Sequence, residues 1–301
     1  MPSAQSVQVR AIIEEQVTPL FKGLSDVAAV RQLWEVLAAR SAPAPDEIKW
    51  EPVTAGSVPC EWIHGSAPQG KQAVIYLHGG GYFFGSVRTF RDLIGRLSIA
   101  SGVWVLAPDY RLAPEHPFPA ALDNVLDVYR WLLDTGIESR DVAIAGDSAG
   151  GGLAVATMLA LRDDGERLPA AAVLLSPWTD LTCTGDSCKS RAESDPLLTR
   201  EALVTAAARY LAGADPTSGL ASPIYADLRG LPPLLVHVGS DEILLNDATR
   251  LVERARAAEV DAELQVWEGM WHDFQRQAGF GVTESQESID IIGAFIKKRL
   301  G

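Results

Sequence analysis

One pentapeptide places a serine between glycines, where a predicted strand meets a predicted helix. Gly146-Asp147-Ser148-Ala149-Gly150 fits the pattern G-x-S-x-G, with the apolar run DVAIA before it and the helical run GGLAVATMLALR after it. In this setting the serine sits on a sharp turn, and the start of the helix favours negative charge that develops nearby. Ser148 is therefore a candidate nucleophile. The alternative is a glycine-rich turn that holds a serine by chance.

A second motif can supply backbone donors to a reacting oxygen. His78-Gly79-Gly80-Gly81 follows the predicted strand AVIYL. Consecutive glycines let a loop point bare N–H groups at an oxyanion, and each such donor is worth about 3–4 kcal/mol in acyl transfer. Loops of this type form the oxyanion holes of lipases and esterases. A phosphate-binding loop is the alternative, but the G-K-[ST] of a Walker motif is missing and the glycine spacing does not fit a dinucleotide site.

A serine nucleophile needs a base, and the chain has only 5 histidines. His272 lies in the loop GMWHDF, after the last predicted strand, which is where the base is expected. The others lie in the glycine loop, an early hairpin, an apolar strand and a proline-bounded loop: His78, His64, His237 and His116. Elimination therefore predicts His272 as the base.

The acid of such a triad follows the serine and precedes the histidine. Asp241 lies in Gly239-Ser240-Asp241-Glu242, which closes the apolar strand LLVHV, and fits this position best. Glu242 and Asp247 are the competitors. We expect Glu242 to face solvent and Asp247 to cap the helix that follows. The acid would hold the imidazole in the right tautomer and stabilise the imidazolium.

Alternating strands and helices are predicted around these motifs. Several strands are near-continuous apolar runs, which is typical of strands covered on both faces. After a hairpin over 50–65, the predicted strands are 73–77, 103–107, 142–145, 171–175, 234–238 and 263–267, and the predicted helices are 86–101, 118–135, 149–163, 246–259 and 284–299. This alternation predicts an α/β fold whose mostly parallel sheet is flanked by helices.

Two segments break the alternation. Residues 1–45 are predicted to form a helical arm that ends in a Pro/Ala linker. Residues 178–225 contain no predicted core strand, and an insertion of that length between core strands is usually functional, for example as a lid. The catalytic domain is accordingly predicted to comprise residues 46–177 and 226–301.

Composition limits the class of partner. The chain has 301 residues and a net charge of -13, which disfavours binding to nucleic acid or to anionic membrane surfaces. It has no apolar run of about 18 residues and no secretory signal pattern, so we expect neither a membrane span nor export. Cys60, Cys183 and Cys188 are few and lack metal-ligand spacing. We therefore expect reduced thiols, a cytoplasmic location and no metal.

Six motifs in order resemble those of a known family: HGGGYFFGS, DYRLAPEHPFPAALDN, GDSAGG, SPWTDL, GSDEILLND and GMWHDF. Together they resemble the hormone-sensitive-lipase-like family of carboxylesterases (bacterial family IV), in the α/β-hydrolase superfamily. The resemblance implies an α/β-hydrolase fold, oxyanion donors at Gly80, Gly81 and Ala149, Asp241 as the acid, and a cap built from the arm and the insertion. It also implies hydrolysis of short- to medium-chain esters through an acyl-enzyme, no cofactor, and a possible homodimer through the edge strand near 263–268.

Aromatic residues near the motifs are candidates for lining an acyl or alcohol pocket, with core packing as the alternative. They are Tyr82, Phe83, Phe84, Trp178, Trp271 and Phe274. The same triad could act on lactones, carbamates or amides, which these motifs do not distinguish. A non-catalytic binding protein of the same fold is the remaining alternative. A plant hormone receptor branch that resembles the family lacks the histidine, so His272 argues against that alternative.

Overall fold

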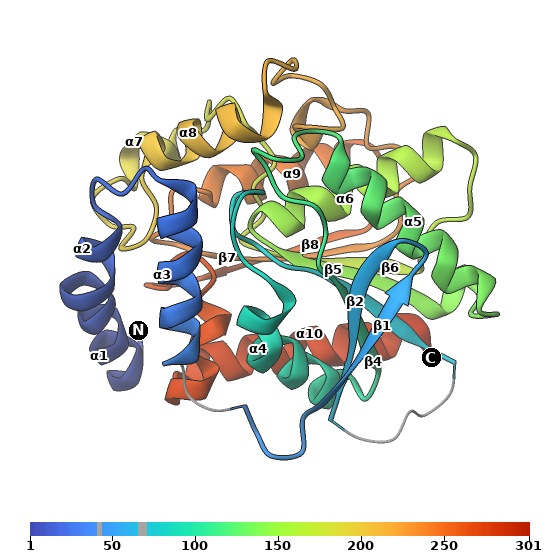
Figure 1. Ribbon diagram of the computed structural model, residues 1–301, viewed down its shortest axis with the longest axis horizontal. Coiled ribbons are helices and arrows are strands. Elements are labelled where there is room, and N and C mark those ends of the chain that lie inside the picture. The colour runs from blue at the N-terminus through green and yellow to red at the C-terminus, as the bar shows by residue number, and fades with distance from the viewer. Residues whose placement is uncertain (41–43, 66–70) are drawn as a thin grey trace.

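An eight-stranded sheet forms the centre of the protein, as seen in a computed structural model that describes residues 1–40, 44–65 and 71–301 (Figure 1). The strand order is β1-β2-β4-β3-β5-β6-β7-β8. The strands are β1 (Lys49–Ala55), β2 (Val58–His64), β3 (Ala73–Leu77), β4 (Trp104–Pro108), β5 (Val142–Asp147), β6 (Ala171–Leu175), β7 (Leu234–Gly239) and β8 (Ala262–Trp267). The hairpin β1–β2 joins β4 in antiparallel fashion, and all later pairs are parallel, which confirms the predicted mostly parallel sheet.

Alternate residues of the central strands point into two separate apolar layers. Val74 and Tyr76 of β3 pack in one layer, and Ile75 and Leu77 pack in the other. All residues of β3, β5, β6 and β7 are buried, as expected for strands covered on both faces. The near-continuous apolar runs in the sequence therefore correspond to these strands.

Helices cover both faces of the sheet (Figure 1). One layer contains α4 (Val87–Ser101) and α10 (Thr283–Leu300), and the other contains α5 (Ala120–Asp134), α6 (Ala149–Asp163) and α9 (Leu245–Ala257). Short 3-10 turns, η2 (Ser139–Asp141) and η4 (Phe274–Phe280), precede β5 and α10. A reciprocal hydrogen-bond pair between Ser86 and Thr89 starts α4, and Gly102 in the left-handed region ends it. The predicted helices are thereby confirmed, with ends that differ by one or two residues.

The N-terminal arm is helical, as predicted. It consists of α1 (Ala4–Ile12), the π-helical turn η1 (Ile13–Val17), α2 (Thr18–Phe21) and α3 (Val27–Ala39). Ser3 caps α1, and its hydroxyl also donates to the Glu284 carboxylate at the start of α10, with 2.8 Å between the oxygens. Part of the predicted linker, residues 41–43, lies outside the described residues.

The insertion lies against the arm at the end of the sheet where the functional motifs meet (Figure 1). It contains α7 (Ser187–Ser190), α8 (Arg200–Leu211) and the turn η3 (Pro223–Tyr225), with no strand in residues 178–225. Arg209 of α8 donates to the Ser25 carbonyl at 2.6 Å, and the Thr18 hydroxyl donates to the Pro196 carbonyl. Arm and insertion are thus hydrogen-bonded to each other.

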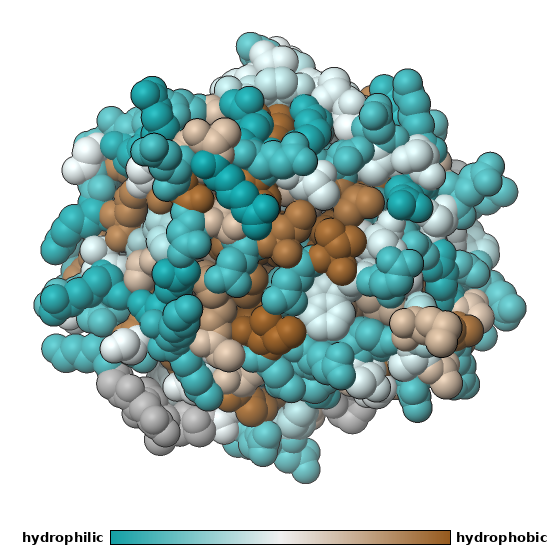
Figure 2. All heavy atoms as spheres, turned by 180° about the vertical axis from the view of Figure 1, so that it is seen from behind, coloured by the Kyte–Doolittle hydropathy of each residue, from teal (hydrophilic) through white to brown (hydrophobic). Residues whose placement is uncertain are grey.

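Seen from the face opposite to that of Figure 1, the surface is largely hydrophilic, with apolar side chains gathered in separate patches (Figure 2). None of the helices within the described ranges combines the length and the hydropathy that crossing a bilayer requires.

A close contact between α4 and α10 predicts a measurable loss of stability on substitution. A Cβ atom at Gly293 of α10 would lie 2.5 Å from the carbonyl carbon of Ala100 in α4, which is backbone and cannot swing away. Helix propensity favours alanine by about 1 kcal/mol, whereas overpacking costs about 1–3 kcal/mol, and here the clash with backbone wins. We expect Gly293→Ala to lower the free energy of unfolding by about 2 kcal/mol in a urea titration.

The control for that experiment is Glu287→Ala, an exposed position on the same helix, which should change stability by less than about 0.5 kcal/mol. A Gly293→Ala variant as stable as the wild type would mean that α4 and α10 are not in close backbone contact.

Candidate active site

Ser148 occupies a strained turn between β5 and α6. Its φ is 52° and its ψ is -119°, a region that non-glycine residues rarely adopt. A Cβ atom at Gly146 would collide with the Gly150 carbonyl, and one at Gly150 would collide with the Leu77 carbonyl of β3. The two glycines of the pentapeptide are therefore required by close backbone packing, which holds the turn against the neighbouring strand.

The predicted base lies within hydrogen-bond reach of the serine. His272, in the loop after β8, has its Nε2 atom 3.0 Å from the Ser148 Oγ atom. Its Nδ1 atom lies 2.8 Å from the Glu242 Oε2 atom. Because a carboxylate only accepts, Nδ1 carries the hydrogen and Nε2 is free to accept from the serine hydroxyl. The three side chains form one continuous hydrogen-bonded chain.

The prediction that Asp241 contacts the histidine is wrong. The Asp241 carboxylate turns away and accepts a hydrogen bond from Arg10 of α1, with a nitrogen–oxygen distance of 2.6 Å. Glu242 is fully buried, contrary to the expectation that it faces solvent. Its Oε1 atom accepts from the Gly239 N–H at 2.6 Å and from the Ser176 hydroxyl at 2.8 Å, and these donors at the ends of β7 and β6 aim it at His272.

A signal for Glu242 was present in the sequence. Ile243 and Leu244 follow it directly and are fully buried, so the chain re-enters the core at this point. Asp241, one residue earlier, still lies at the surface side of the turn, where a cation from a distant segment reaches it.

Neighbouring carboxylates control the charge of the histidine. Burial lowers the pKa of His272, but Asp273 and Glu242 outweigh burial and hold that pKa well above its ordinary value. Burial raises the pKa of Glu242, and the contact with His272 opposes this rise. The site therefore stabilises an imidazolium, which is the species that forms when the serine loses its proton.

The glycine loop after β3 is shaped to leave N–H groups available. Gly80 and Gly81 have φ values of 114° and 57°, and the N–H groups of Phe83 and Phe84 both donate to the Gly80 carbonyl at 3.0 Å. Within the part of the chain that the structure describes, no protein acceptor binds the N–H groups of Gly80, Gly81 or Ala149. The loop can thus present donors beside Ser148.

The six aromatic candidates are mostly packed inside the protein. Tyr82 stacks on Tyr210 of α8 with ring centroids 3.7 Å apart, and Phe84 meets Trp34 of α3 edge-on at 5.0 Å. The remaining four are buried: Phe83, Trp178, Trp271 and Phe274. Trp271 and Phe274 form a small apolar cluster with Met270 and Ile13 of the arm. Their surfaces contribute to packing between the arm and the base loop.

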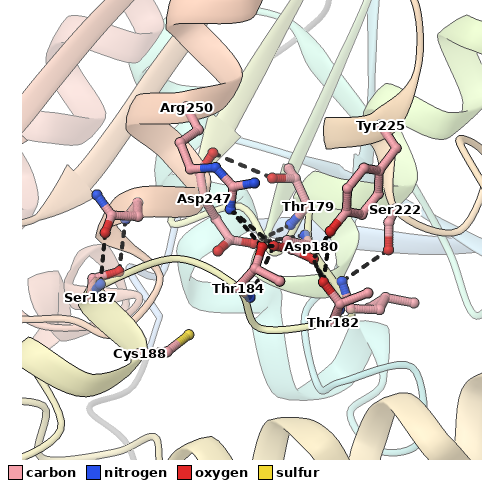
Figure 3. A network of polar contacts seen from close by, with 12 residues as sticks. Thr179, Asp180, Thr182, Thr184, Ser187, Cys188, Ser222, Tyr225, Asp247 and Arg250 are labelled. Atoms are coloured by element: carbon pink, nitrogen blue, oxygen red, sulfur yellow. Dashed lines mark hydrogen bonds and ion pairs between the residues drawn. The ribbon is translucent and has the colours of Figure 1, made fainter. Parts of the chain in front are cut away.

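Asp247 does not cap its own helix, contrary to expectation. It is fully buried in the first turn of α9, and its Oδ2 atom accepts from the N–H groups of Thr179 and Asp180, each at 2.8 Å (Figure 3). Asp180 in turn accepts from Thr182, Thr184, Tyr225 and Arg250 (Figure 3). This network fixes the first residues of the insertion to α9.

The other histidines lie away from this chain of hydrogen bonds. His237 is fully buried in β7 and bonds to the Ser288 hydroxyl at 2.8 Å, and burial lowers its pKa to about 3. His64 stacks on Trp104 with 4.0 Å between centroids. His116 is exposed rather than packed in its loop. Among the described residues, no cluster of three histidine, cysteine or carboxylate side chains has the arrangement of a metal site.

Known proteins resemble this chain over nearly its whole length. A family model for the α/β hydrolase fold matches residues 74–276. An acetyl-hydrolase from Streptomyces hygroscopicus is 44% identical over 249 residues, which cover 83% of each protein. An esterase from Acinetobacter venetianus is 38% identical over 262 residues, or 84% of this chain and 86% of that protein.

The structural comparison agrees. A crystal structure of an esterase from the bacterial hormone-sensitive lipase family superposes with a TM-score of 0.95 at 44% identity, and the match covers 100% of both chains. With a strained serine, a histidine and a buried carboxylate hydrogen-bonded in series, this chain belongs to the hormone-sensitive-lipase-like family of α/β hydrolases and is a carboxylic ester hydrolase.

Proposed function

We propose that Ser148, His272 and Glu242 are the catalytic triad, and that the N–H groups of Gly80, Gly81 and Ala149 form the oxyanion hole. The observation that carries this proposal is the continuous chain from the Ser148 hydroxyl through His272 to Glu242, with distances of 3.0 and 2.8 Å. Glu242 takes the role that the sequence suggested for Asp241.

The reaction follows from this geometry. His272 removes the serine proton as the Ser148 Oγ atom attacks the ester carbonyl, and the carbonyl oxygen becomes an oxyanion held by backbone N–H groups. The imidazolium then protonates the leaving alcohol. Water deprotonated by His272 attacks the acyl-enzyme, and the acid product leaves.

We propose short acyl chains as the preferred substrates. α8 lies close over the oxyanion loop, since a Cβ atom at Gly81 would be 3.2 Å from the Ala206 side chain and 3.3 Å from the Phe83 ring. Such close packing restricts the space beside the oxyanion hole. The name of the acetyl-hydrolase relative is in keeping with a small acyl group.

We also propose that residues 1–45 and 178–225 together form a cap over residues 46–177 and 226–301. The hydrogen bonds between arm and insertion support this division. A homodimer through β8 remains a proposal, favoured by the position of β8 at the sheet edge and by Val266, which is 47% exposed. A cytoplasmic location is likewise proposed, on the basis of three free cysteines.

An ester series tests the reaction and the acyl preference together. We expect p-nitrophenyl esters from acetate to laurate to show the highest kcat/KM at acetate to butyrate. Ser148→Ala should lose about 10⁶-fold in kcat, because the nucleophile is removed while the fold remains. A folded wild type that hydrolyses none of these esters would exclude simple esters, and lactones, carbamates and amides would then be assayed with the same variant.

Separate amide substitutions of the two adjacent acids, Asp241 and Glu242, identify which of them is the acid of the triad. Glu242→Gln can offer an amide donor to Nδ1 and favour the wrong tautomer, so we expect kcat to fall about 10³–10⁴-fold. Asp241→Asn breaks a partly exposed ion pair with Arg10, worth about 1 kcal/mol, so kcat should stay within about fivefold. The reverse pattern, with Asp241→Asn inactive and Glu242→Gln active, would return the role to Asp241.

A further inference from the structure

A second pair of buried carboxyl groups flanks the nucleophile and the base. Asp147 directly precedes Ser148 and is fully buried, and Asp273 directly follows His272 and is 8% exposed. Burial raises the pKa of Asp147, and the neighbouring carboxyl group of Asp273 raises it further. The Asp273 Oδ2 atom also lies 3.2 Å from His272 Nε2, the same nitrogen that faces the serine.

Each carboxyl group has one oxygen that lacks a protein donor. The Asp147 Oδ1 atom accepts from the Tyr76 hydroxyl at 2.8 Å and from the Gly79 N–H at 3.0 Å. Within the described chain, the buried Asp147 Oδ2 and Asp273 Oδ1 atoms have no hydrogen-bond donor. Two neighbouring buried carboxyl groups repel each other when both are ionised. One proton shared between them would give each of these two oxygens a hydrogen-bond partner.

The surrounding charges favour a single negative charge on this pair. Arg276 of η4 is the cation that attracts both carboxylates, and it packs over the rings of Trp34 and Phe90 at 4.3 and 4.5 Å. The single positive charge of Arg276 neutralises one negative charge, so a second negative charge on Asp147 and Asp273 would be uncompensated. Burial raises the pKa of Asp147 well above its ordinary value, and the charge of Asp273 raises it further.

The other titratable groups that face the site are few. Tyr76 and Tyr110 lie near Asp147, and burial raises the pKa of both hydroxyls, so they stay neutral donors. Arg276 also attracts Asp92, and His272 attracts Asp195 and Glu242. None of these groups supplies a second cation to the carboxyl pair.

We propose that Asp147 and Asp273 share one proton, so that the pair presents one negative charge to His272 instead of two. The proposal rests on the proposed role of His272 as base. With Glu242 at Nδ1 and a fully ionised Asp273 at Nε2, the imidazole would be held as an imidazolium that cannot accept the serine proton. The shared proton leaves Nε2 free to accept, and Asp273 acts as a positioning residue for the base.

The arrangement also couples the charge of the pair to the geometry of the oxyanion loop. The Asp147 carboxyl group accepts a hydrogen bond from the N–H of Gly79, which precedes Gly80. Asp147 itself is the residue that precedes Ser148. The same carboxyl that takes part in the shared proton therefore ties the nucleophile turn to the oxyanion donors.

Two amide substitutions test the shared proton through the acidic limb of the pH profile of kcat/KM. In Asp273→Asn the one negative charge moves to Asp147, farther from the imidazole, so the pKa of His272 falls and the limb moves about one pH unit lower. In Asp147→Asn the charge stays entirely on Asp273, so the pKa of His272 does not fall and the limb stays or moves higher. The expected result is therefore a limb that moves to lower pH in Asp273→Asn and does not move to lower pH in Asp147→Asn.

If both carboxyl groups were ionised in the wild type, each substitution would remove one negative charge. The acidic limb would then move to lower pH in both variants. That outcome, or a limb that does not move in Asp273→Asn, overturns the proposal. Asp241→Asn is the matched control, because it removes a carboxylate that pairs with Arg10 and should leave the limb in place.

A measurement that needs no activity covers the case in which Asp147→Asn fails to fold. The infrared carbonyl stretch of protonated carboxyl groups should be weaker in Asp273→Asn than in the wild type at neutral pH, by the intensity of one group. Equal band intensity in the two proteins would overturn the shared proton. If Ser148→Ala or Glu242→Gln were fully active, the proposed function would fail instead, so the two failures are distinguishable.

Discussion

Close contact between β3 and the turn at Ser148 is the constraint on which the active site depends. Gly150 packs directly against the Leu77 carbonyl, and no side chain fits between them. This contact forces Ser148 into its strained conformation and brings the loop after β3 next to it. The proposed nucleophile and the proposed oxyanion donors therefore come from two strands that cannot separate without breaking the sheet, and the energy of the packed sheet maintains the strain.

Charge compensation follows from burial at the same place. Ser148 and His272 are only 6% and 5% exposed, so water screens their charges little. Glu242 lies 2.8 Å from one ring nitrogen of His272, and Asp273 lies 3.2 Å from the other. In such surroundings each unpaired charge raises the free energy of the folded protein. The balance between carboxylates, one histidine and Arg276 thus decides whether the base can work at neutral pH.

The sequence predicted the fold and most of the site because those signals are local. The strands 73–77 and 171–175 have the predicted bounds, since uninterrupted apolar runs mark strands buried on both faces. Short motifs pointed to the serine, the glycine loop and the histidine, and the structure brings Ser148 and His272 within hydrogen-bond reach of each other. For the acid, the motif offered two adjacent carboxylates, and the partner toward which Asp241 turns is Arg10, which lies 231 residues earlier in the chain. The aromatic candidates pose the same difficulty, since motif position does not separate a pocket lining from packing against the arm.

One side chain of the arm connects parts of the protein that are far apart in the sequence. Arg10 donates to the Asp241 carboxylate, to the Gly269 carbonyl in the turn after β8, and to the Ser194 carbonyl in the insertion. Release of α1 would therefore break contacts to all three segments at once. Detachment of the arm, loosening of the insertion and disorder of the loop beside Glu242 should consequently occur as one cooperative transition with a common melting temperature, rather than as separate steps.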